Sequence, residues 1–310
     1  MNILLIGYGS IGARHGAILA DLGCQVAVVS GNHDCPYERF SDISAALDAR
    51  SYQGAIIATP TKRHFNNFQD LAAAGFAGRI LVEKPLWSEV GADDGLKAEL
   101  AGHVHTAYNL RFHPLLQRSK ELLADRPIYS INAYAGQYLP QWRPSRDYRS
   151  TYSALKEEGG GALRDLSHEL DYLQWLAGTW QSVVACGGLV SRLEINSDDL
   201  CGLMMRTAGC PMVQAQLNYL DMVPGGRREF AVNAEGLSLQ VNLNQGWLSI
   251  NGKEPEIIKP DRNYTYTEQL KAWLAGPENS ELCDYDGGMR VVRLIDAAEK
   301  SMIERCWVDR

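Results

Sequence analysis

Long hydrophobic runs are missing from this sequence of 310 residues. No apolar stretch approaches the roughly 18 residues that a membrane-spanning helix requires. The first residues carry neither the basic segment nor the cleavage site of a signal peptide. We therefore expect a cytoplasmic protein without a membrane partner.

Cysteine pairs with the spacing of a metal site are also missing. The 7 cysteines are scattered, and no two of them form a C-x-x-C pair. His103 and His105 have no acid-rich cluster nearby that could complete a metal site. The sequence therefore predicts no metal and thiols that stay reduced.

Basic side chains are fewer than acidic ones: 30 against 37, which gives a net charge of -7. A basic surface that binds nucleic acid or an anionic membrane is therefore not expected. Hydrophobic residues make up 45% and charged residues 22% of the chain, which is typical of a globular protein. At roughly 150 residues per domain, the length favours two domains.

Two patterns of secondary structure divide the chain. In the first part, short apolar runs such as 3–6 and 80–82 alternate with helical patterns, which indicates a parallel sheet of βαβ units. From about residue 183 to 250, strand-like runs follow one another with no helix between them, which indicates an antiparallel sheet. We predict an α/β protein with one domain over residues 1–112 and another over 113–310.

Glycines recur at the end of the first predicted strand, in a G-x-G-x-x-G motif that opens a predicted helix. The first glycine permits a tight turn, the second lets backbone N–H groups approach a pyrophosphate, and the third allows helix and strand to pack closely. The positive end of the helix also favours an anion. The sequence therefore predicts a dinucleotide site at Gly7, Tyr8, Gly9, Ser10, Ile11 and Gly12.

An acidic residue is missing where the second predicted strand ends. NAD sites usually place a carboxylate there to accept from the ribose hydroxyls. Polar residues follow Val29 instead, and the predicted cofactor contacts are Ser30, Asn32 and His33. With Arg39 nearby they suit a 2′-phosphate, whereas Asp34 could turn back toward a 2′-hydroxyl. The predicted cofactor is NAD(P), with a preference for NADP.

Further motifs follow in order along the chain. Thr59-Pro60 with His64 follows one predicted strand, Glu83-Lys84-Pro85 ends the next, and residues 108–114 lie at the predicted domain junction. Together with the glycine loop and the helical residues 286–301, they resemble the Gfo/Idh/MocA family (glucose–fructose oxidoreductase, inositol dehydrogenase and rhizopine catabolism proteins). The resemblance spans nearly the whole chain.

This resemblance implies an N-terminal Rossmann domain that binds the dinucleotide and a C-terminal α/β domain with an open, mostly antiparallel sheet. It implies hydride transfer between NAD(P) and a sugar, polyol or nucleotide sugar, and a homodimer or homotetramer formed through the C-terminal sheet. The cofactor contacts would then include Thr59, Pro60, His64 and Glu83. Two alternatives stay open: a non-catalytic NAD(P)-binding regulator, and a glycosidase that oxidises its substrate only transiently.

Lys84 is the expected catalytic residue. It ends a parallel strand, where α/β sheets open their ligand crevice, and Pro85 biases its backbone toward an extended form. Burial beside an oxidised nicotinamide lowers the pKa of an ammonium group, which can then hold the reacting oxygen and relay its proton. Glu83 can orient this lysine. In the family, Glu-Lys-Pro marks the catalytic lysine, which the resemblance assigns to Lys84.

Leucines at every third or fourth position predict one helix over residues 163–176. On such a helix Asp165 and His168 share a face, and the histidine can exchange the alcohol proton as hydride moves. The family usually spaces these residues four positions apart rather than three. If the chain is aligned with the family on the glycines that precede this helix, Asp165 occupies the position of the family's acidic residue. If it is aligned on His168, Arg164 occupies that position. A capping aspartate with a structural histidine is the alternative.

Substrate contacts are expected in two places. Asn109 and Arg111 lie at the predicted domain junction, where ligands often bind, although Arg111 could simply tie the domains together. The second place is a cationic, aromatic loop with Trp142, Arg143, Arg146, Tyr148 and Arg149. Aromatic rings stack on sugars, and arginines bind carboxylate or phosphate. We hypothesise that this loop recognises an acidic sugar or a nucleotide-sugar pyrophosphate; a solvated loop is the alternative.

Overall fold

The computed structural model describes residues 1–32, 34–91, 102–276 and 281–310. It divides into two compact units: residues 1–112 with 263–289 form unit 1, and residues 113–262 with 290–310 form unit 2. The division after Phe112 coincides with the predicted boundary.

The return of residues 263–289 to unit 1 differs from the prediction, which placed them in the second domain. Helix α9 (Tyr264–Ala275) packs against helix α1 (Ser10–Asp21), and strand β15 (Cys283–Asp284) pairs antiparallel with strand β6 (Val104–Thr106). These contacts join residues far apart in the chain, which local sequence patterns do not report.

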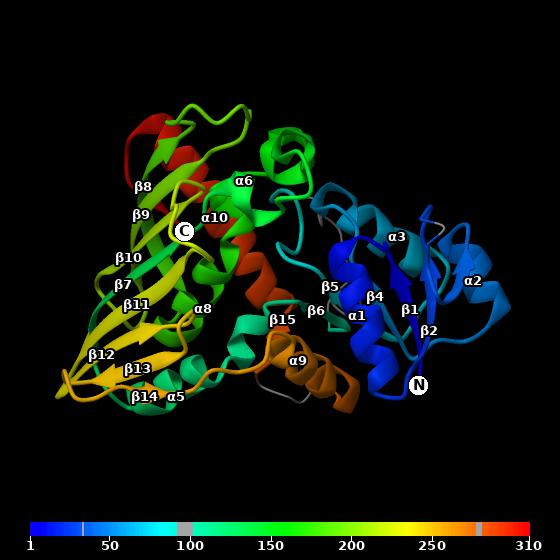
Figure 1. The fold of residues 1–310 in the computed structure, drawn as a ribbon, viewed down its shortest axis with the longest axis horizontal. Coiled ribbons are helices and arrows are strands. Elements are labelled where there is room, and N and C mark those ends of the chain that lie inside the picture. The colour runs from blue at the N-terminus through cyan, green and yellow to red at the C-terminus, as the bar shows by residue number, and fades with distance from the viewer. Residues whose placement is uncertain (33, 92–101, 277–280) are drawn as a thin grey trace. The chain divides into compact units, whose positions relative to one another are not determined.

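Unit 1 is built on a seven-stranded sheet in the order β15-β6-β5-β4-β1-β2-β3, parallel throughout except for β15 (Figure 1). Its other strands are β1 (Asn2–Ile6), β2 (Gln25–Val29), β3 (Glu38–Phe40), β4 (Gly54–Ile57) and β5 (Arg79–Val82). Its other helices are α2 (Ile43–Ala49), η1 (Thr61–Arg63), α3 (His64–Ala73) and η2 (Asn109–Phe112). All four residues of β4 are buried, as in a sheet covered on both faces. The predicted βαβ arrangement is confirmed.

Unit 2 contains a nine-stranded sheet in the order β14-β13-β12-β11-β7-β10-β9-β8-β16, in which only β7 and β10 pair parallel. Its strands are β7 (Ile128–Gly136), β8 (Trp180–Gly188), β9 (Leu200–Thr207), β10 (Val213–Asn218), β11 (Arg227–Ala234), β12 (Leu237–Asn242), β13 (Trp247–Ile250), β14 (Glu256–Ile257) and β16 (Val308–Asp309). In β12, buried Leu237 and Leu239 alternate with exposed Ser238 and Gln240. The predicted, mostly antiparallel sheet is confirmed.

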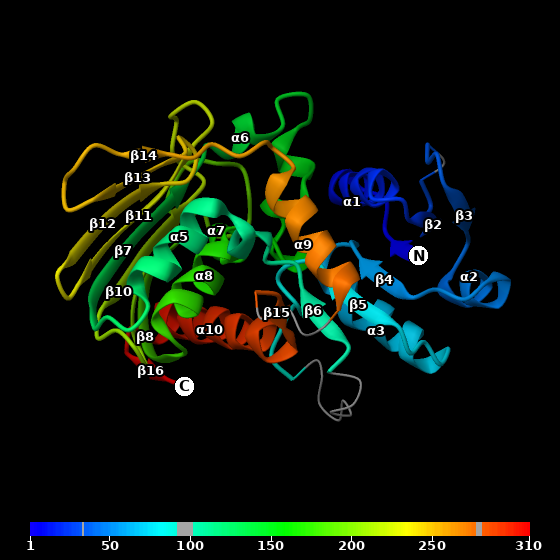
Figure 2. The same ribbon diagram turned by 90° about the horizontal axis from the view of Figure 1, so that it is seen from below.

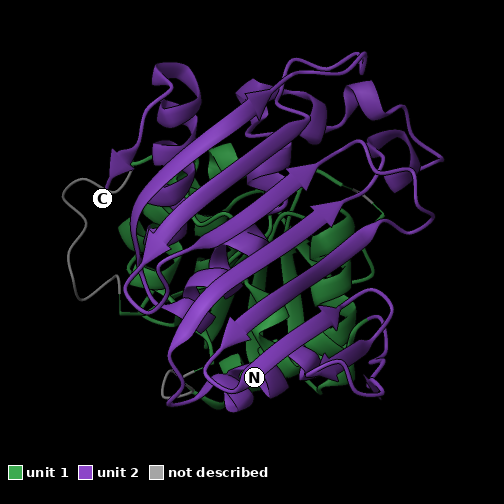
Figure 3. Cartoon of the chain, turned by 90° about the vertical axis from the view of Figure 1, so that its left-hand side faces the viewer, with its two compact units in different colours: residues 1–112, 263–289 green, residues 113–262, 290–310 purple. Residues whose placement is uncertain are grey.

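Helices cover one face of this sheet (Figure 2), and Figure 3 looks onto its opposite face. The longer helices are α5 (Pro114–Leu123), α8 (Ser167–Ala177) and α10 (Tyr285–Glu304), which starts in unit 1 and continues in unit 2. Unit 2 also contains the shorter helices α6 (Leu139–Trp142), η3 (Tyr148–Ser150), η4 (Tyr152–Ala154), η5 (Lys156–Glu158) and α7 (Ala162–Asp165).

The single helix predicted over residues 163–176 is wrong, because α7 ends at Asp165 and α8 begins at Ser167. Leu166 lies between them with φ −93° and ψ 26°, outside the helical region. The interruption is one residue long, so Leu163, Leu166 and Leu170 all remain buried. Leucine spacing reports the buried face, and it therefore could not reveal the break.

Within the described residues, no helix combines the length and the apolar composition that a membrane span needs. None of the seven cysteines, all of which lie within the described residues, forms a disulfide. No cluster of three or more histidine, cysteine, aspartate or glutamate side chains in the described part of the chain is arranged to hold a metal ion.

Candidate functional site

The predicted glycine loop joins β1 to α1 in unit 1. Gly7 has φ +96°, and a Cβ atom there would lie 2.7 Å from the carbonyl oxygen of Ala58. A Cβ atom on Gly12 would lie 2.2 Å from the carbonyl oxygen of Gly7, whereas one on Gly9 would meet nothing within 4 Å. Gly9 caps α1 without a side-chain hydrogen bond, which leaves the first N–H groups of the helix to a ligand. The loop therefore fits a pyrophosphate.

Ser10 begins helix α1, while Tyr8 and Ile11 are half-buried beside the core of unit 1. The Tyr8 ring meets Tyr37 edge to face, with 6.0 Å between ring centroids. The backbone carbonyl of Tyr8 accepts a hydrogen bond from Asn32 Nδ2 at 3.3 Å. This bond joins the glycine loop to the segment after β2.

The end of β2 carries polar groups and a guanidinium. Ser30 Oγ accepts from the backbone N–H of Asn32 at 3.0 Å, and Asn32 Oδ1 accepts from the N–H of Asp34 at 3.1 Å. Arg39 donates to the Ser30 carbonyl oxygen at 3.2 Å, so its positive charge lies at the end of β2. The predicted contact His33 lies outside the described residues.

Lys84 follows β5 at the carboxyl edge of the parallel sheet of unit 1, the same edge at which the glycine loop leaves β1. Its side chain is half-buried, and its peptide bond to Pro85 is cis. The backbone N–H of Lys84 donates to Glu83 Oε2 at 3.3 Å. Glu83 therefore holds the backbone at the predicted catalytic residue.

His15 was missed in the sequence, although it lies on α1 only three residues after the glycine motif. It is 0% exposed, and its Nε2 donates to Glu83 Oε1 at 2.7 Å. Burial raises the pKa of the Glu83 carboxyl, but the hydrogen bond and charge of His15 and the charge of Lys84 outweigh burial and bring that pKa below its usual range. The carboxylate form of Glu83 is thereby favoured.

His64 ties two loops of unit 1 together. Its Nε2 lies 2.9 Å from the carbonyl oxygen of Thr59, and its Nδ1 lies 3.1 Å from that of Pro85. The ring is buried, and burial lowers the pKa of His64. Thr59 Oγ1 also donates to Asn67 at 2.8 Å, and Pro60 precedes η1. These contacts give His64 a structural role; its contact with a cofactor stays a prediction.

Asn109 and Arg111 are both buried in η2. Asn109 Nδ2 donates to Thr265 Oγ1 at 2.7 Å, and Arg111 donates to the carbonyl oxygen of Leu282 at 3.3 Å. All four residues belong to unit 1, so these bonds attach η2 to the returning segment 263–289. Substrate contact by Asn109 or Arg111 stays a prediction.

Asp165 is buried in unit 2 and is bound by two tyrosines. Tyr219, 0% exposed, donates its hydroxyl to Asp165 Oδ2 at 2.6 Å. Burial raises the pKa of Tyr152 well above its usual value, and the charge of Asp165 and a hydrogen bond to it raise that pKa further. Both phenols therefore stay protonated and donate to this carboxylate. Neither tyrosine was singled out in the sequence.

Asp165 and His168 do not lie on one helix, contrary to what the sequence predicted, and their joint role stays a prediction. Asp165 is the last residue of α7, and His168, half-buried, is the second residue of α8. Arg164 instead pairs with Glu299, with 2.9 and 3.0 Å between nitrogen and oxygen atoms. Of the two candidates for the acidic position, Asp165 is therefore the residue inside the tyrosine cluster.

Asp198 is a further, half-buried carboxyl that the sequence did not reveal. Its Oδ2 accepts from the N–H of Leu163 at 2.9 Å at the start of α7. Gly161 has φ +123°, and a Cβ atom there would lie 1.9 Å from Asp198 Oδ1. Burial, the largest cause, raises the pKa of Asp198 to about 6. The last of the three consecutive glycines thus makes room for a carboxyl rather than for a ligand.

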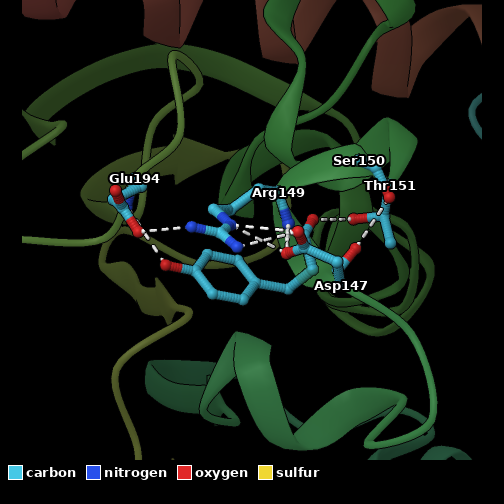
Figure 4. Close-up of polar contacts among 6 residues, drawn as sticks. Asp147, Arg149, Ser150, Thr151 and Glu194 are labelled. Carbon is cyan, nitrogen blue, oxygen red and sulfur yellow. Dashed lines mark hydrogen bonds and ion pairs between the residues drawn. The ribbon is translucent and has the colours of Figure 1, made fainter.

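The predicted cationic loop carries less free charge than its sequence suggests. Arg149 makes ion pairs with Asp147 at 2.9 Å and with Glu194 at 3.1 Å (Figure 4). Trp142 donates from Nε1 to the carbonyl oxygen of Gln137 at 3.1 Å. The side chains of these ion pairs remain exposed to solvent, so substrate binding by the loop stays a prediction and a solvated loop stays its alternative.

Family comparisons match both parts of the chain. Residues 1–103 match the model of an oxidoreductase family with an NAD-binding Rossmann fold, and residues 116–249 match the model of the GFO/IDH/MocA C-terminal domain. The rhizopine catabolism protein MocA of Rhizobium meliloti is 29% identical over 197 residues, which are 56% of this chain and 56% of that protein. An uncharacterized oxidoreductase of Synechocystis is 29% identical over 214 residues, 64% of this chain and 56% of that protein. The chain thus spans just over half the length of these curated relatives.

Solved structures share the fold over the whole chain. Levoglucosan dehydrogenase in complex with NADH and levoglucosan has a TM-score of 0.84 at 19% identity, covering 100% of this chain and 99% of that one. GenD2 from gentamicin A biosynthesis in complex with NAD has 0.83 at 21%, covering 100% and 96%. The WlbA dehydrogenase from Bordetella pertussis in complex with NADH and UDP-GlcNAcA has 0.80 at 19%, covering 100% and 98%. At these identities the likeness concerns the fold alone.

Proposed function

Because this chain belongs to the Gfo/Idh/MocA family of oxidoreductases, we propose that it transfers a hydride between a nicotinamide cofactor and an alcohol or ketone carbon of a carbohydrate-like substrate. One observation carries the proposal: Lys84 and the glycine loop, with open space at Gly9, lie at the same edge of one parallel sheet. Ligands of α/β sheets bind at this edge. The NADH and sugar ligands of the fold neighbours agree with this assignment.

Each group of residues has its own task in this proposal. The loop at Gly9 and the first turn of α1 bind the pyrophosphate, and the nicotinamide, when bound, supplies or accepts the hydride. Lys84 holds the substrate oxygen and exchanges its proton, while Glu83 and His15 fix the backbone at Lys84. Asp165 and His168 are the acid–base groups that unit 2 contributes.

A preference for NADP is part of the proposal. Among the described residues, the first carboxylate after β2 is that of Asp34. The backbone N–H of Asp34 donates a hydrogen bond to the side chain of Asn32. The guanidinium of Arg39 donates a hydrogen bond to the carbonyl oxygen of Ser30, at the end of β2. A guanidinium pairs well with a 2′-phosphate. We expect NADPH to bind at least tenfold more tightly than NADH, and R39Q to remove most of this difference in a fluorescence titration. An unchanged ratio in R39Q would count against the role of Arg39.

We also propose a homodimer or homotetramer formed through the sheet of unit 2. A hollow of about 380 Å³ lies over β7, β11, β12 and β13, with the aromatic residues Tyr134 and Trp247 in its lining. An aromatic hollow on a sheet face suits an interface. Light scattering should give a dimer or tetramer for the native chain, and A231R, which places a charge in this hollow, should reduce the mass. A monomeric native chain contradicts this part of the proposal.

The test of the activity is absorbance at 340 nm with NADP or NAD and a panel of sugars, polyols and nucleotide sugars. We expect a net change with at least one substrate, and K84M should lower kcat by about 100-fold or more while cofactor affinity changes little. Sugar hydrolysis without a net change would instead favour the transient oxidation of a glycosidase. Cofactor binding with no reaction anywhere in the panel would favour a regulator.

A further inference from the structure

A small hollow in unit 2 combines a cation with aromatic and hydroxyl groups. It lies at the start of the loop that follows β7 and is too small for a whole sugar, which suits a single substituent. Its lining residues are Leu139, Trp142, Arg143, Tyr148, Thr151 and Ser153.

Arg143 brings an uncompensated charge to this hollow. Arg149, on the same loop, is neutralised by Asp147 and Glu194 (Figure 4). Arg143 is half-buried, and no carboxylate among the residues that the structure describes forms an ion pair with it. Charged groups that are removed from water are normally paired, so a half-buried guanidinium without a partner favours an anionic ligand.

The neighbouring hydroxyls complete a set of donors. Tyr148 Oη accepts from the backbone N–H of Glu194 at 3.3 Å, so its own hydrogen can be donated to a ligand. The Thr151 hydroxyl donates to the carbonyl oxygen of Tyr148 at 2.6 Å, which holds the turn in place (Figure 4). A guanidinium beside a phenol is a donor arrangement suited to carboxylate or phosphate oxygens.

Packing connects this hollow to the carboxylate predicted to act in catalysis. Trp142 meets Tyr219 edge to face, with 5.2 Å between ring centroids, and Tyr219 donates to Asp165 at 2.6 Å. Tyr152, which also binds Asp165, lies between Thr151 and Ser153 in the chain. Trp142, which lines the hollow, therefore packs directly against a tyrosine that binds Asp165.

We propose that Arg143, with Trp142 and Tyr148, forms a subsite for an anionic substituent of the substrate, a carboxylate or a phosphate. The inference rests on the proposed function, because it narrows the substrate class to acidic or phosphorylated carbohydrates. The sequence-based hypothesis assigned anion recognition to the whole cationic loop. The present inference assigns it to Arg143, because Arg149 already forms ion pairs within unit 2.

The test is calorimetric binding to the NADPH-loaded protein, which needs no turnover. The probes are glucuronate for a carboxylate, UDP-glucose for a pyrophosphate, and glucose as the neutral reference. We expect the native protein to bind at least one anionic probe more tightly than glucose, and R143Q to weaken that binding roughly 10- to 100-fold. The affinity for glucose should change less than about twofold.

R146Q is the matched control, because it removes one positive charge from the same loop but Arg146 does not line the hollow. It should leave the affinity for both anionic probes within about twofold of native. The proposal is overturned if neither anionic probe binds better than glucose, or if R143Q and R146Q weaken binding equally. If the protein binds an anionic probe through Arg143 but has no reductase activity, the proposed function is refuted and the proposed subsite is still supported.

Discussion

His15 and Glu83 form a buried pair between the first helix and the strand end that carries Lys84, with 2.7 Å between Nε2 and Oε1. His15 also meets Tyr266 of α9 edge to face, at 5.9 Å between ring centroids. The same carboxylate accepts from the backbone N–H of Lys84. One carboxylate thus connects helix α1, which follows the glycine loop, to the predicted catalytic lysine.

Replacing His15 by leucine should leave the Glu83 carboxylate buried without its strongest donor. We expect H15L to lose about 3 kcal/mol of unfolding free energy at neutral pH, measured by urea denaturation. Because the pKa of Glu83 is lowered in the folded state, the stability from this pair is present above its ordinary value near 4.5 and is lost as pH falls below it. The difference between H15L and native protein should therefore shrink in acid.

The double variant H15L/E83Q is the control for that prediction. A neutral amide does not need the charge of a partner, so E83Q should cost less in the H15L background than in the native one. A coupling of about 0.5–3 kcal/mol is expected. Strictly additive effects of the two substitutions would contradict a direct interaction.

Gly9 and Gly12 should respond differently to alanine. A Cβ atom at Gly12 would meet the Gly7 carbonyl oxygen at 2.2 Å, so G12A should lower stability by about 1–3 kcal/mol even without cofactor. A Cβ atom at Gly9 meets nothing within 4 Å, so G9A should keep its melting temperature but lose at least tenfold in NADPH affinity. Thermal unfolding and fluorescence titration separate the two effects. A G9A protein that binds NADPH normally would exclude the pyrophosphate from this position.

Tyr219 should act as a positioning residue for Asp165. Y219F removes a hydroxyl that donates to the carboxylate at 2.6 Å. We expect kcat to fall about tenfold with little change in cofactor affinity, because a less well oriented acid–base group slows the reaction step. Y134F is the matched control, because Tyr134 makes a similar bond, at 2.8 Å, to Asp221. Equal losses of kcat in the two variants would mean that Tyr219 has only a structural role.

Asp198 should make the protein less stable as pH rises through the acid range. Its pKa is raised to about 6 by burial, so the folded state binds its proton more tightly than the unfolded chain does. Stability from this protonated form is therefore lost between about pH 4 and pH 6. D198N removes this titration. As pH rises over that range, the native protein should lose up to about 3 kcal/mol of unfolding free energy relative to D198N. A pH-independent difference would refute the assignment.

The amino-acid sequence by itself determined the two sheets, the glycine loop and the position of Lys84. These features depend on local signals: apolar runs of strand length, glycines where a side chain would collide, and a short motif at a strand end. The resemblance of several motifs in one order identified the family, which the comparisons confirm.

Only the tertiary structure decided which polar groups meet. His15 pairs with Glu83 across 68 positions, Tyr219 reaches Asp165 across 54, and residues 263–289 return to the first unit. Local periodicity does not encode such contacts, because they depend on how distant elements pack. The break at Leu166 escaped prediction for a related reason: the same leucines are buried in one helix or in two.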